Sequence, residues 1–206
     1  MPIPAPRIGL FGGSFDPPHA GHLAAARAAR AARGLERVIW MPAARSPFKS
    51  AQTGGAAGKH RAELVRLLLE GEPGMELSTL ELERGGASYT IDTVEELLRQ
   101  LPIGTQLFLI IGEDNLAGLP HWHRARELLA RVQPVVLTRR VAAVAKDPGE
   151  GEFAAALRAG YLAMDPVDLS STQLRAQLRG AHSAPPGIGE SAFRYMQRHG
   201  LYEVAL

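Results

Sequence analysis

Short apolar runs that alternate with longer helical patterns constrain the fold of this chain more than any other feature of its sequence. The runs typical of extended structure cover residues 7–11, 37–41, 75–82, 106–112, 134–138 and 161–165. The helical patterns cover residues 22–33, 60–70, 89–101, 123–132, 172–179 and 190–199. This alternation predicts a mostly parallel sheet with helices on both faces, in a single Rossmann-like α/β domain over residues 1–206 that ends in a short helical segment. Residues 43–58, rich in Gly, Ala and Ser, are expected to form a mobile loop within that domain.

The composition is that of an ordinary globular protein, and it excludes several kinds of site. The 206 residues are 46% hydrophobic and 21% charged, with a net charge of +2 and no cysteine. Disulfides, thiolate metal sites and a cysteine nucleophile are therefore excluded. The small net charge and the 6% aromatic content argue against a nucleic-acid partner. No segment has the character of a signal peptide or a membrane span, so we expect a cytoplasmic protein with no membrane partner. The sequence makes no prediction about oligomeric state.

The segment from Gly12 to His22, GGSFDPPHAGH, carries the clearest chemistry in the chain. Gly12 and Gly13 follow the first apolar run, where glycines permit a tight turn and let a phosphate approach backbone N–H groups. His19 and His22 are three residues apart where a helix is expected to begin, so both rings are predicted to face one ligand. The unpaired N–H groups and the partial positive charge of that helix end favour an anion. Parallel sheets bind ligands beyond the C-terminal ends of their strands, which is where this segment lies.

Each part of this segment also has an ordinary interpretation. A glycine pair after a strand is often only a turn, and a histidine at a helix start is often a cap or a surface residue. The His-x-x-His spacing also occurs in metal sites, but no third ligand is apparent, so we predict no protein-bound metal. The combination of a strand, two glycines, two prolines and two histidines in one short segment favours a polyphosphate site.

A second segment, LSSTQLR at residues 169–175, is also suited to phosphate. Ser170, Ser171 and Thr172 are typical residues for the start of a helix, and Arg175 lies one turn further on the same side. Hydroxyls, N–H groups and a guanidinium thus converge at one helix end, where they suit the phosphates of a polyphosphate. Taken alone, the pattern also fits an ordinary capped surface helix.

The first segment matches the pattern G-[TS]-F-D-P-x-H-x-G-H, and on this basis the chain resembles the nucleotidyltransferase superfamily. In the form GGSFDPPHAGHL it is similar to the bacterial nicotinate-nucleotide adenylyltransferases. Further segments match that family in the same order: SYTIDT (88–93), IGEDNL (111–116), Trp122-His123, LSSTQLR and HGLY (199–202). The resemblance therefore covers nearly the whole chain.

The resemblance implies transfer of the adenylyl group of ATP to nicotinate mononucleotide, giving nicotinate adenine dinucleotide and pyrophosphate in NAD biosynthesis. Transferases that act on nicotinamide mononucleotide or phosphopantetheine are alternatives, as is a nucleotide-binding regulator that does not catalyse. Mg²⁺ is expected to arrive with ATP, because no carboxylate cluster suggests a protein-built cage. The catalytic residues implied are His19, His22 and Arg175.

The resemblance also implies which residues contact each substrate. The residues that would bind ATP are Gly12, Gly13, Ser14, Phe15, Gly112, Asp114, Ser171 and Thr172. The residues that would bind nicotinate mononucleotide are Asp16, Lys49, Tyr89, Thr90 and Trp122. The Trp122 indole would stack on the pyridine ring, Thr90 would lie at the nicotinate carboxylate, and Asp114 would accept hydrogen bonds from a ribose. The chain has Ser46, Pro47, Phe48 and Lys49 where the family usually has Pro-Pro-His-Lys, so the lysine is kept and the histidine is absent.

Overall fold

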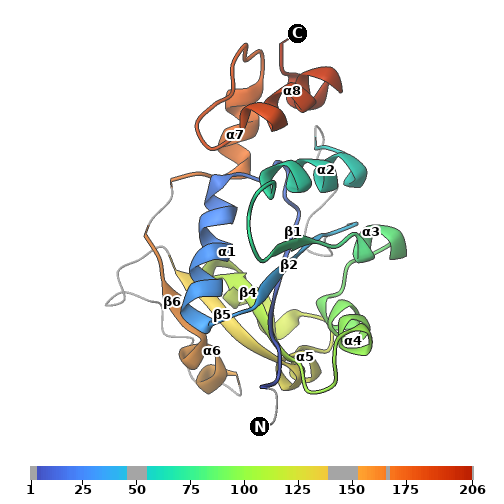
Figure 1. The fold of residues 1–206 in the computed structure, drawn as a ribbon, viewed down its shortest axis with the longest axis vertical. Helices are drawn as coiled ribbons and strands as arrows, with labels where there is room; N and C mark the ends of the chain where they lie inside the picture. The colour runs from blue at the N-terminus through green and yellow to red at the C-terminus, as the bar shows by residue number, and fades with distance from the viewer. Residues whose placement is uncertain (1–3, 46–54, 139–152, 166–167, 206) are drawn as a thin grey trace.

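The strands form one parallel sheet in the order β3-β2-β1-β4-β5-β6. The structure is a computed structural model that describes residues 4–45, 55–138, 153–165 and 168–205 (Figure 1). Strands β1 and β4 lie at the centre, and the chain adds strands outward from them in both directions. This is the doubly wound arrangement that the alternating sequence pattern predicts.

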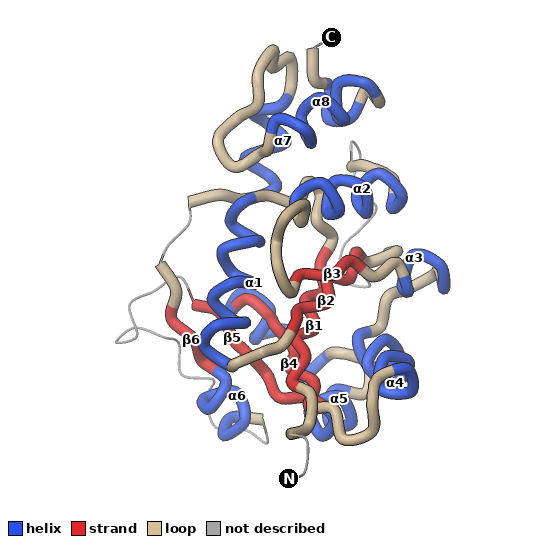
Figure 2. Tube along the Cα trace, in the orientation of Figure 1, coloured by secondary structure: helices blue, strands red, loops and turns tan. Residues whose placement is uncertain are grey.

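Strands and helices follow one another along the chain (Figure 2). The strands are β1 (Arg7–Gly13), β2 (Arg37–Pro42), β3 (Met75–Leu77), β4 (Gln106–Gly112), β5 (Val132–Thr138) and β6 (Tyr161–Ala163). The α-helices are α1 (Ala20–Arg33), α2 (Gly58–Leu68), α3 (Leu80–Arg84), α4 (Thr90–Gln100), α5 (Ala125–Arg131), α6 (Ala154–Gly160), α7 (Ser171–Leu178) and α8 (Glu190–Arg198). The short 3-10 helices are η1 (Glu113–His121) and η3 (Leu201–Glu203).

Helices cover both faces of the sheet, because the central strands are apolar on both faces. In β1, Ile8 and Leu10 belong to the core shared with α4 and α5, whereas Phe11 belongs to the core shared with α1. Helix α1 contributes small side chains, and Ala26 and Ala29 are fully buried against the sheet. Small residues let the helix lie close to the strands, which explains how an alanine-rich segment contributes to a packed core.

The C-terminal helices form a third apolar cluster with α2, beyond the C-terminal end of the sheet (Figure 1). Leu64 of α2, Leu174 of α7 and Met196 of α8 are fully buried at its centre. The end of the chain is thus fixed to the helix that follows β2. This packing brings the N-terminus of α7 to the edge of the sheet where β1 ends.

The predicted strands are confirmed, with one element that differs. Residues 75–82 were expected to be extended, but only Met75–Leu77 pair with β2, and the chain then turns into α3. The N–H of Ser78 still donates to the Trp40 carbonyl, and helix α3 begins two residues later. A short apolar pattern does not distinguish a strand followed by one helical turn from a longer strand, since both bury the same side chains.

Besides α3 and the short η3, two helical elements among the described residues have no counterpart in the prediction. Residues 113–121 form η1 and residues 154–160 form α6. The first has a polar, proline-containing sequence without helical periodicity, and the second is only seven residues long. Residues 46–54 of the predicted mobile loop lie outside the described residues. Among the helices that the structure describes, none has the length and apolarity needed to cross a membrane.

Candidate active site

The segment from Gly12 to His22 lies at the C-terminal ends of the two central strands. Phe11 of β1 and Ile110 of β4 are the last paired residues of these neighbours. Beyond them, β1 leads into α1 on one face of the sheet, and β4 leads into η1 on the other. The strand order reverses at this point, and doubly wound sheets bind their ligands at such a position.

The sharp turn in this segment is made by Phe15, and the glycines before it stay in the strand. Phe15 has φ +48°, whereas Gly12 and Gly13 are the last residues of β1. The predicted glycine turn is therefore misplaced. A positive φ is strained for a residue with a Cβ, but the buried Phe15 ring holds it, with its centroid 5.5 Å from that of Phe11 and 5.2 Å from that of Trp40. Since the side chain belongs to the core, Phe15 has only its backbone to offer a phosphate.

His19 and His22 form a stacked pair at the N-terminus of α1. His19 is the last residue before the helix, and His22 lies in its first turn. The N–H of His19 donates to Nδ1 of His22 over 3.3 Å, and the ring centroids are 3.8 Å apart. Because Nδ1 accepts this bond, the neutral His22 ring carries its proton on Nε2. The Nε2–H group is then a donor of the kind that a phosphate oxygen requires.

The second predicted phosphate segment meets the first. The Ser171 hydroxyl donates to the Pro17 carbonyl over 2.9 Å, and Nη1 of Arg175 donates to the Asp16 carbonyl over 2.6 Å. Nη2 of Arg175 also donates to Oγ1 of Thr172 over 3.3 Å. Residues more than 150 positions apart in the sequence thus form one surface, which has the N-termini of α1 and α7 and a guanidinium on it.

The Asp16 carboxylate is bound inside the protein. Its Oδ1 accepts the Tyr202 hydroxyl over 2.6 Å and the N–H of Ala56 over 3.0 Å, and the residue is buried. Burial, with the nearby Asp16 charge, raises the pKa of Tyr202, so the phenol stays a neutral donor. The role predicted for Asp16 in nucleotide binding stays a prediction.

The residues predicted to bind the acceptor nucleotide gather at the start of α4. Tyr89 precedes α4, and Thr90 is its first residue. The Tyr89 ring lies 4.6 Å from the ring of His123, centroid to centroid. Trp122 is adjacent to His123, directly after η1, and is half-buried against the core. The SYTIDT and Trp122-His123 segments are therefore neighbours at this edge of the sheet.

Comparison with known proteins decides the family. The profile of the cytidylyltransferase-like family matches residues 10–177. The probable nicotinate-nucleotide adenylyltransferase of Gemmatimonas aurantiaca is 40% identical over 202 residues, which cover 95% of this chain and 92% of that protein. Its counterpart in Gloeobacter violaceus is 39% identical and covers 96% of this chain and 97% of its own length. The chain belongs to the nicotinate-nucleotide adenylyltransferase family.

Solved structures support the same fold. The nicotinic acid mononucleotide adenylyltransferase of Plasmodium falciparum complexed with NaAD superimposes with a TM-score of 0.71 at 16% identity. The match covers 97% of this chain and 98% of that one. The same protein complexed with APC gives a TM-score of 0.69 at 15% identity. The predicted fold class, an α/β domain with a parallel sheet, is confirmed.

Arg124 has a structural role that the sequence did not predict. It has φ +53°, and its guanidinium makes two bonds to Glu95 of α4, at 2.8 and 3.1 Å, and two to Glu127 of α5, at 2.6 and 2.9 Å. It thus fixes the segment that carries Trp122 to the helix that carries Thr90. A charged residue among other charged residues gives no sequence signal for such a role, because the pairing depends on how the helices meet.

Two further predicted ATP contacts, Gly112 and Asp114, lie at the end of β4 and just after it. A Cβ on Gly112 would come within 2.3 Å of Oδ1 of Asp114, so a larger residue there would displace that carboxylate. Asp114 is exposed, and the Asn115 side-chain amide donates to it over 3.3 Å. The Asp114 carboxylate is thus placed to accept hydrogen bonds from a ligand bound where β1 and β4 end. Lys49, predicted to bind the acceptor, lies outside the described residues.

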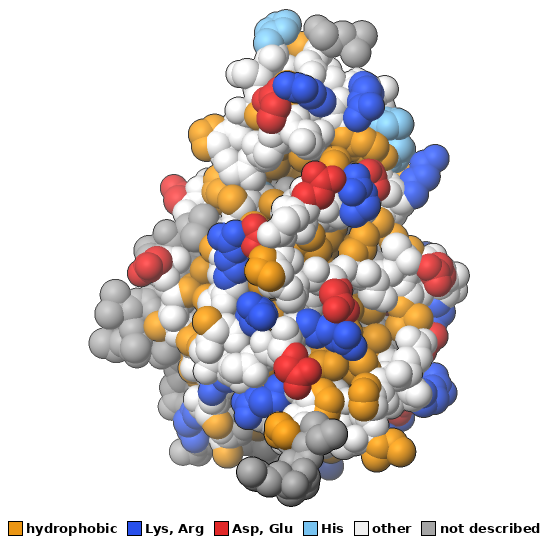
Figure 3. Space-filling model, viewed as in Figure 1, with side chains coloured by type: hydrophobic (Ala, Val, Ile, Leu, Met, Phe, Trp, Pro, Cys, Tyr) orange, Lys and Arg blue, Asp and Glu red, His pale blue; other side chains and the backbone are white. Residues whose placement is uncertain are grey.

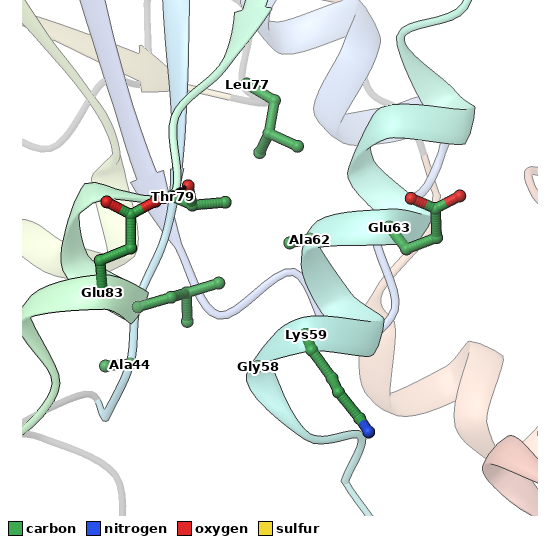
Figure 4. A pocket seen from close by; sticks show the side chains of 9 residues that line it. Ala44, Gly58, Lys59, Ala62, Glu63, Leu77, Thr79 and Glu83 are labelled. Atoms are coloured by element: carbon green, nitrogen blue, oxygen red, sulfur yellow. Dashed lines mark hydrogen bonds between the residues drawn. The ribbon is translucent and has the colours of Figure 1, made fainter.

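The described residues contain no group of three or more His, Asp or Glu side chains that could hold a metal ion. A cavity of about 650 Å³ lies between α2 and α3, and Figure 4 shows Leu77, Thr79 and Glu83 on one side of it and Lys59 and Glu63 on the other. Of the residues predicted to bind either substrate, none of those that the structure describes lines it. The site of interest is therefore the surface around α1, α7 and η1.

Proposed function

We propose that this protein transfers the adenylyl group of ATP to nicotinate mononucleotide and releases pyrophosphate. The observation that carries the proposal is the joining of the His19–His22 helix end to the α7 helix end through Arg175 and Ser171. Together they offer backbone N–H groups, the His22 imidazole and a guanidinium to one polyphosphate. Membership of the adenylyltransferase family assigns the reaction class, and the relatives' names give the acceptor.

The reaction is an in-line displacement at the α-phosphorus. An oxygen of the mononucleotide phosphate forms a bond to the α-phosphorus, and the bond from that phosphorus to the bridging β-phosphate oxygen breaks. The attacking phosphate is already an anion at neutral pH, so no general base is required. Catalysis comes from positioning and from stabilising the charge that develops on the transferred group and on the leaving pyrophosphate.

Each catalytic residue has a distinct role in this proposal. His22 donates from Nε2 to a non-bridging oxygen of the α-phosphate, and His19 fixes the His22 ring by donating to its Nδ1. Arg175, with the hydroxyls of Ser171 and Thr172, holds the β- and γ-phosphates and then the leaving pyrophosphate. Mg²⁺ enters as part of the ATP substrate, bound by its phosphate oxygens.

The acceptor nucleotide is recognised near the start of α4, on the other side of the ends of β1 and β4 from the ATP phosphates. Backbone N–H groups at the start of α4, near Thr90, recognise the nicotinate carboxylate, and Trp122 stacks on the pyridine ring. Parallel assays with nicotinate mononucleotide, nicotinamide mononucleotide and phosphopantetheine test this, with pyrophosphate release as the readout. Preference for either of the other two acceptors would overturn the assignment, and no pyrophosphate release with any of them would favour a regulator without catalysis.

Replacement of Trp122 by alanine is expected mainly to raise KM for nicotinate mononucleotide, by about tenfold for one lost aromatic contact of 0.5–1.5 kcal/mol together with its buried area. The KM for ATP should stay within about twofold, because the ATP phosphates bind on the other side of the sheet centre. Steady-state kinetics with each substrate varied in turn measures both constants. If the KM for ATP rises instead, the two substrates have been assigned to the wrong sides.

The other roles considered for the chain find less support. On the face in Figure 3, basic and acidic side chains are interspersed. Several charged side chains of the described residues are also paired, as Arg27 is with Glu72. A nucleic-acid-binding face would concentrate positive charge.

We propose a cytoplasmic location, because the sequence contains no cysteine and so makes no use of disulfides.

A further inference from the structure

Arg61 of α2 is a buried arginine that ties together the chain segments around the phosphate site. Its Nη1 donates to the Ser14 carbonyl over 2.6 Å, and its Nη2 donates to the Ala43 carbonyl, also over 2.6 Å. Its Nε donates to the Ala56 carbonyl over 3.1 Å. Only 7% of the residue is exposed. A charged group this deeply buried is costly unless its donors are satisfied, so this arrangement is a specific feature of the fold.

The bond to Ser14 fixes the direction of the next backbone donor. The peptide between Ser14 and Phe15 is trans, so the carbonyl and the following N–H point in opposite directions. With the carbonyl held by Arg61, the N–H of Phe15 is directed away from α2. Phe15 is also the residue with the strained φ of +48°. The Arg61 bond on one side and the buried ring on the other together hold this conformation.

The other half of the same loop is fixed from the C-terminal segment. Oδ1 of Asp16 accepts the Tyr202 hydroxyl over 2.6 Å and the N–H of Ala56, whose own carbonyl accepts from Arg61. The carbonyl of Asp16 accepts from Arg175, which the proposed mechanism places on the phosphates. The Ser14–Asp16 segment is therefore held from three directions: Arg61 and Arg175 bind its backbone carbonyls, and Tyr202 binds the Asp16 side chain.

We propose that Arg61 is a positioning residue for adenylyl transfer, with Tyr202 as its counterpart: they hold the Ser14–Asp16 backbone in the conformation that places the Phe15 N–H and Arg175 on the ATP phosphates. This inference rests on the proposed function. Arg61 does not contact the substrates, and it acts through the backbone carbonyls that it binds. The planar guanidinium matters because an ammonium group cannot reach these separate carbonyls at once.

The test compares two arginines on the same helix. Arg61→Lys is expected to lower kcat by about 10²-fold through a displacement of the loop of about 1 Å, with the KM for the acceptor within about threefold. Arg66→Lys is the matched control, because Arg66 is half exposed and pairs only with Glu63 and Glu70 among the described residues. It should keep kcat within about twofold, since exposed ion pairs contribute little. Each variant is assayed well below its own melting temperature, with its fold checked by circular dichroism.

A second measurement separates positioning from a general loss of structure. For Arg61→Ala, added guanidinium ion at concentrations too low to unfold the wild-type protein should restore part of kcat, whereas the same ion should not raise the activity of Tyr202→Phe. Tyr202→Phe should lower kcat about tenfold, since it loses one hydrogen bond to a charged partner. Lack of rescue together with a near-normal kcat for Arg61→Lys would overturn the inference.

A third readout is independent of the acceptor. Binding of a non-hydrolysable ATP analogue should raise the melting temperature of the wild-type protein and of Arg66→Lys, and by clearly less for Arg61→Lys. An equal rise in all three would contradict the positioning role even if no transfer were detected. Wild-type protein that binds the analogue but transfers nothing would instead contradict the proposed function, so the two failures are distinguishable.

Discussion

His22→Ala is expected to lower kcat by about 10²-fold or more, on the order of 3 kcal/mol of transition-state stabilisation from one lost donor. The physical reason lies in the hydrogen bond that fixes the ring. Nδ1 of His22 accepts the N–H of His19, which leaves the proton on Nε2 for the phosphate. Steady-state pyrophosphate release at saturating substrates gives kcat, and pre-steady-state measurement gives the rate constant of the chemical step.

Two further substitutions distinguish the roles of the two ring nitrogens of His22. In His22→Asn, the side-chain oxygen can still accept the N–H of His19, but the distal donor is lost, so the melting temperature should hold while kcat falls as far as in His22→Ala. In His22→Gln, the amide can reach the position of Nε2, so part of kcat should return. His182→Ala is the control, since that histidine is exposed between α7 and α8. An Asn variant with near-normal turnover would remove His22 from the mechanism.

The local part of the site could be read from the sequence because its residues are close together in the chain. His19 and His22 are separated by one helical turn, so the periodicity of a helix was enough to bring their rings together. Gly34 likewise ends α1 in a left-handed conformation, as a glycine after an alanine-rich run predicts. The apolar runs allowed the strands to be predicted for a similar reason, since a strand buried on both faces must be apolar at nearly every position.

The rest of the site depends on contacts between distant segments, which have no local signal. Arg124 acquires its role only when α4 and α5 pack together, and the turn at Phe15 depends on the contact between its ring and that of Trp40. The sequence does contain one indication that Arg61 has a role. It falls three positions before Leu64 and seven before Leu68, on the same helix face as these leucines, where an arginine requires an explanation.

Trp40→Ala is expected to cause the largest loss of stability, about 3–5 kcal/mol, because a fully buried tryptophan leaves a large cavity when truncated. For a chain of this size that corresponds to a fall in melting temperature of about 10 °C or more, measurable by calorimetry. The Trp40 ring contacts Phe11 and Phe15, with centroids 5.0 and 5.2 Å away, and its Nε1 lies 3.5 Å from Sδ of Met75.

Trp122→Ala is the matched control, since Trp40 and Trp122 are the only tryptophans in the sequence. Trp122 is half-buried, so its truncation should cost far less stability while it impairs acceptor binding. Trp40→Ala should show the opposite pattern, with the added effect that Phe15 loses the contact that holds its strained backbone. Its kcat should therefore fall even at temperatures where the variant is fully folded, whereas the KM for the acceptor should change little. If Trp40→Ala retains full kcat under those conditions, the conformation of Phe15 does not depend on its contact with Trp40, and the hydrogen bonds of Arg61, Arg175 and Tyr202 are sufficient to maintain it.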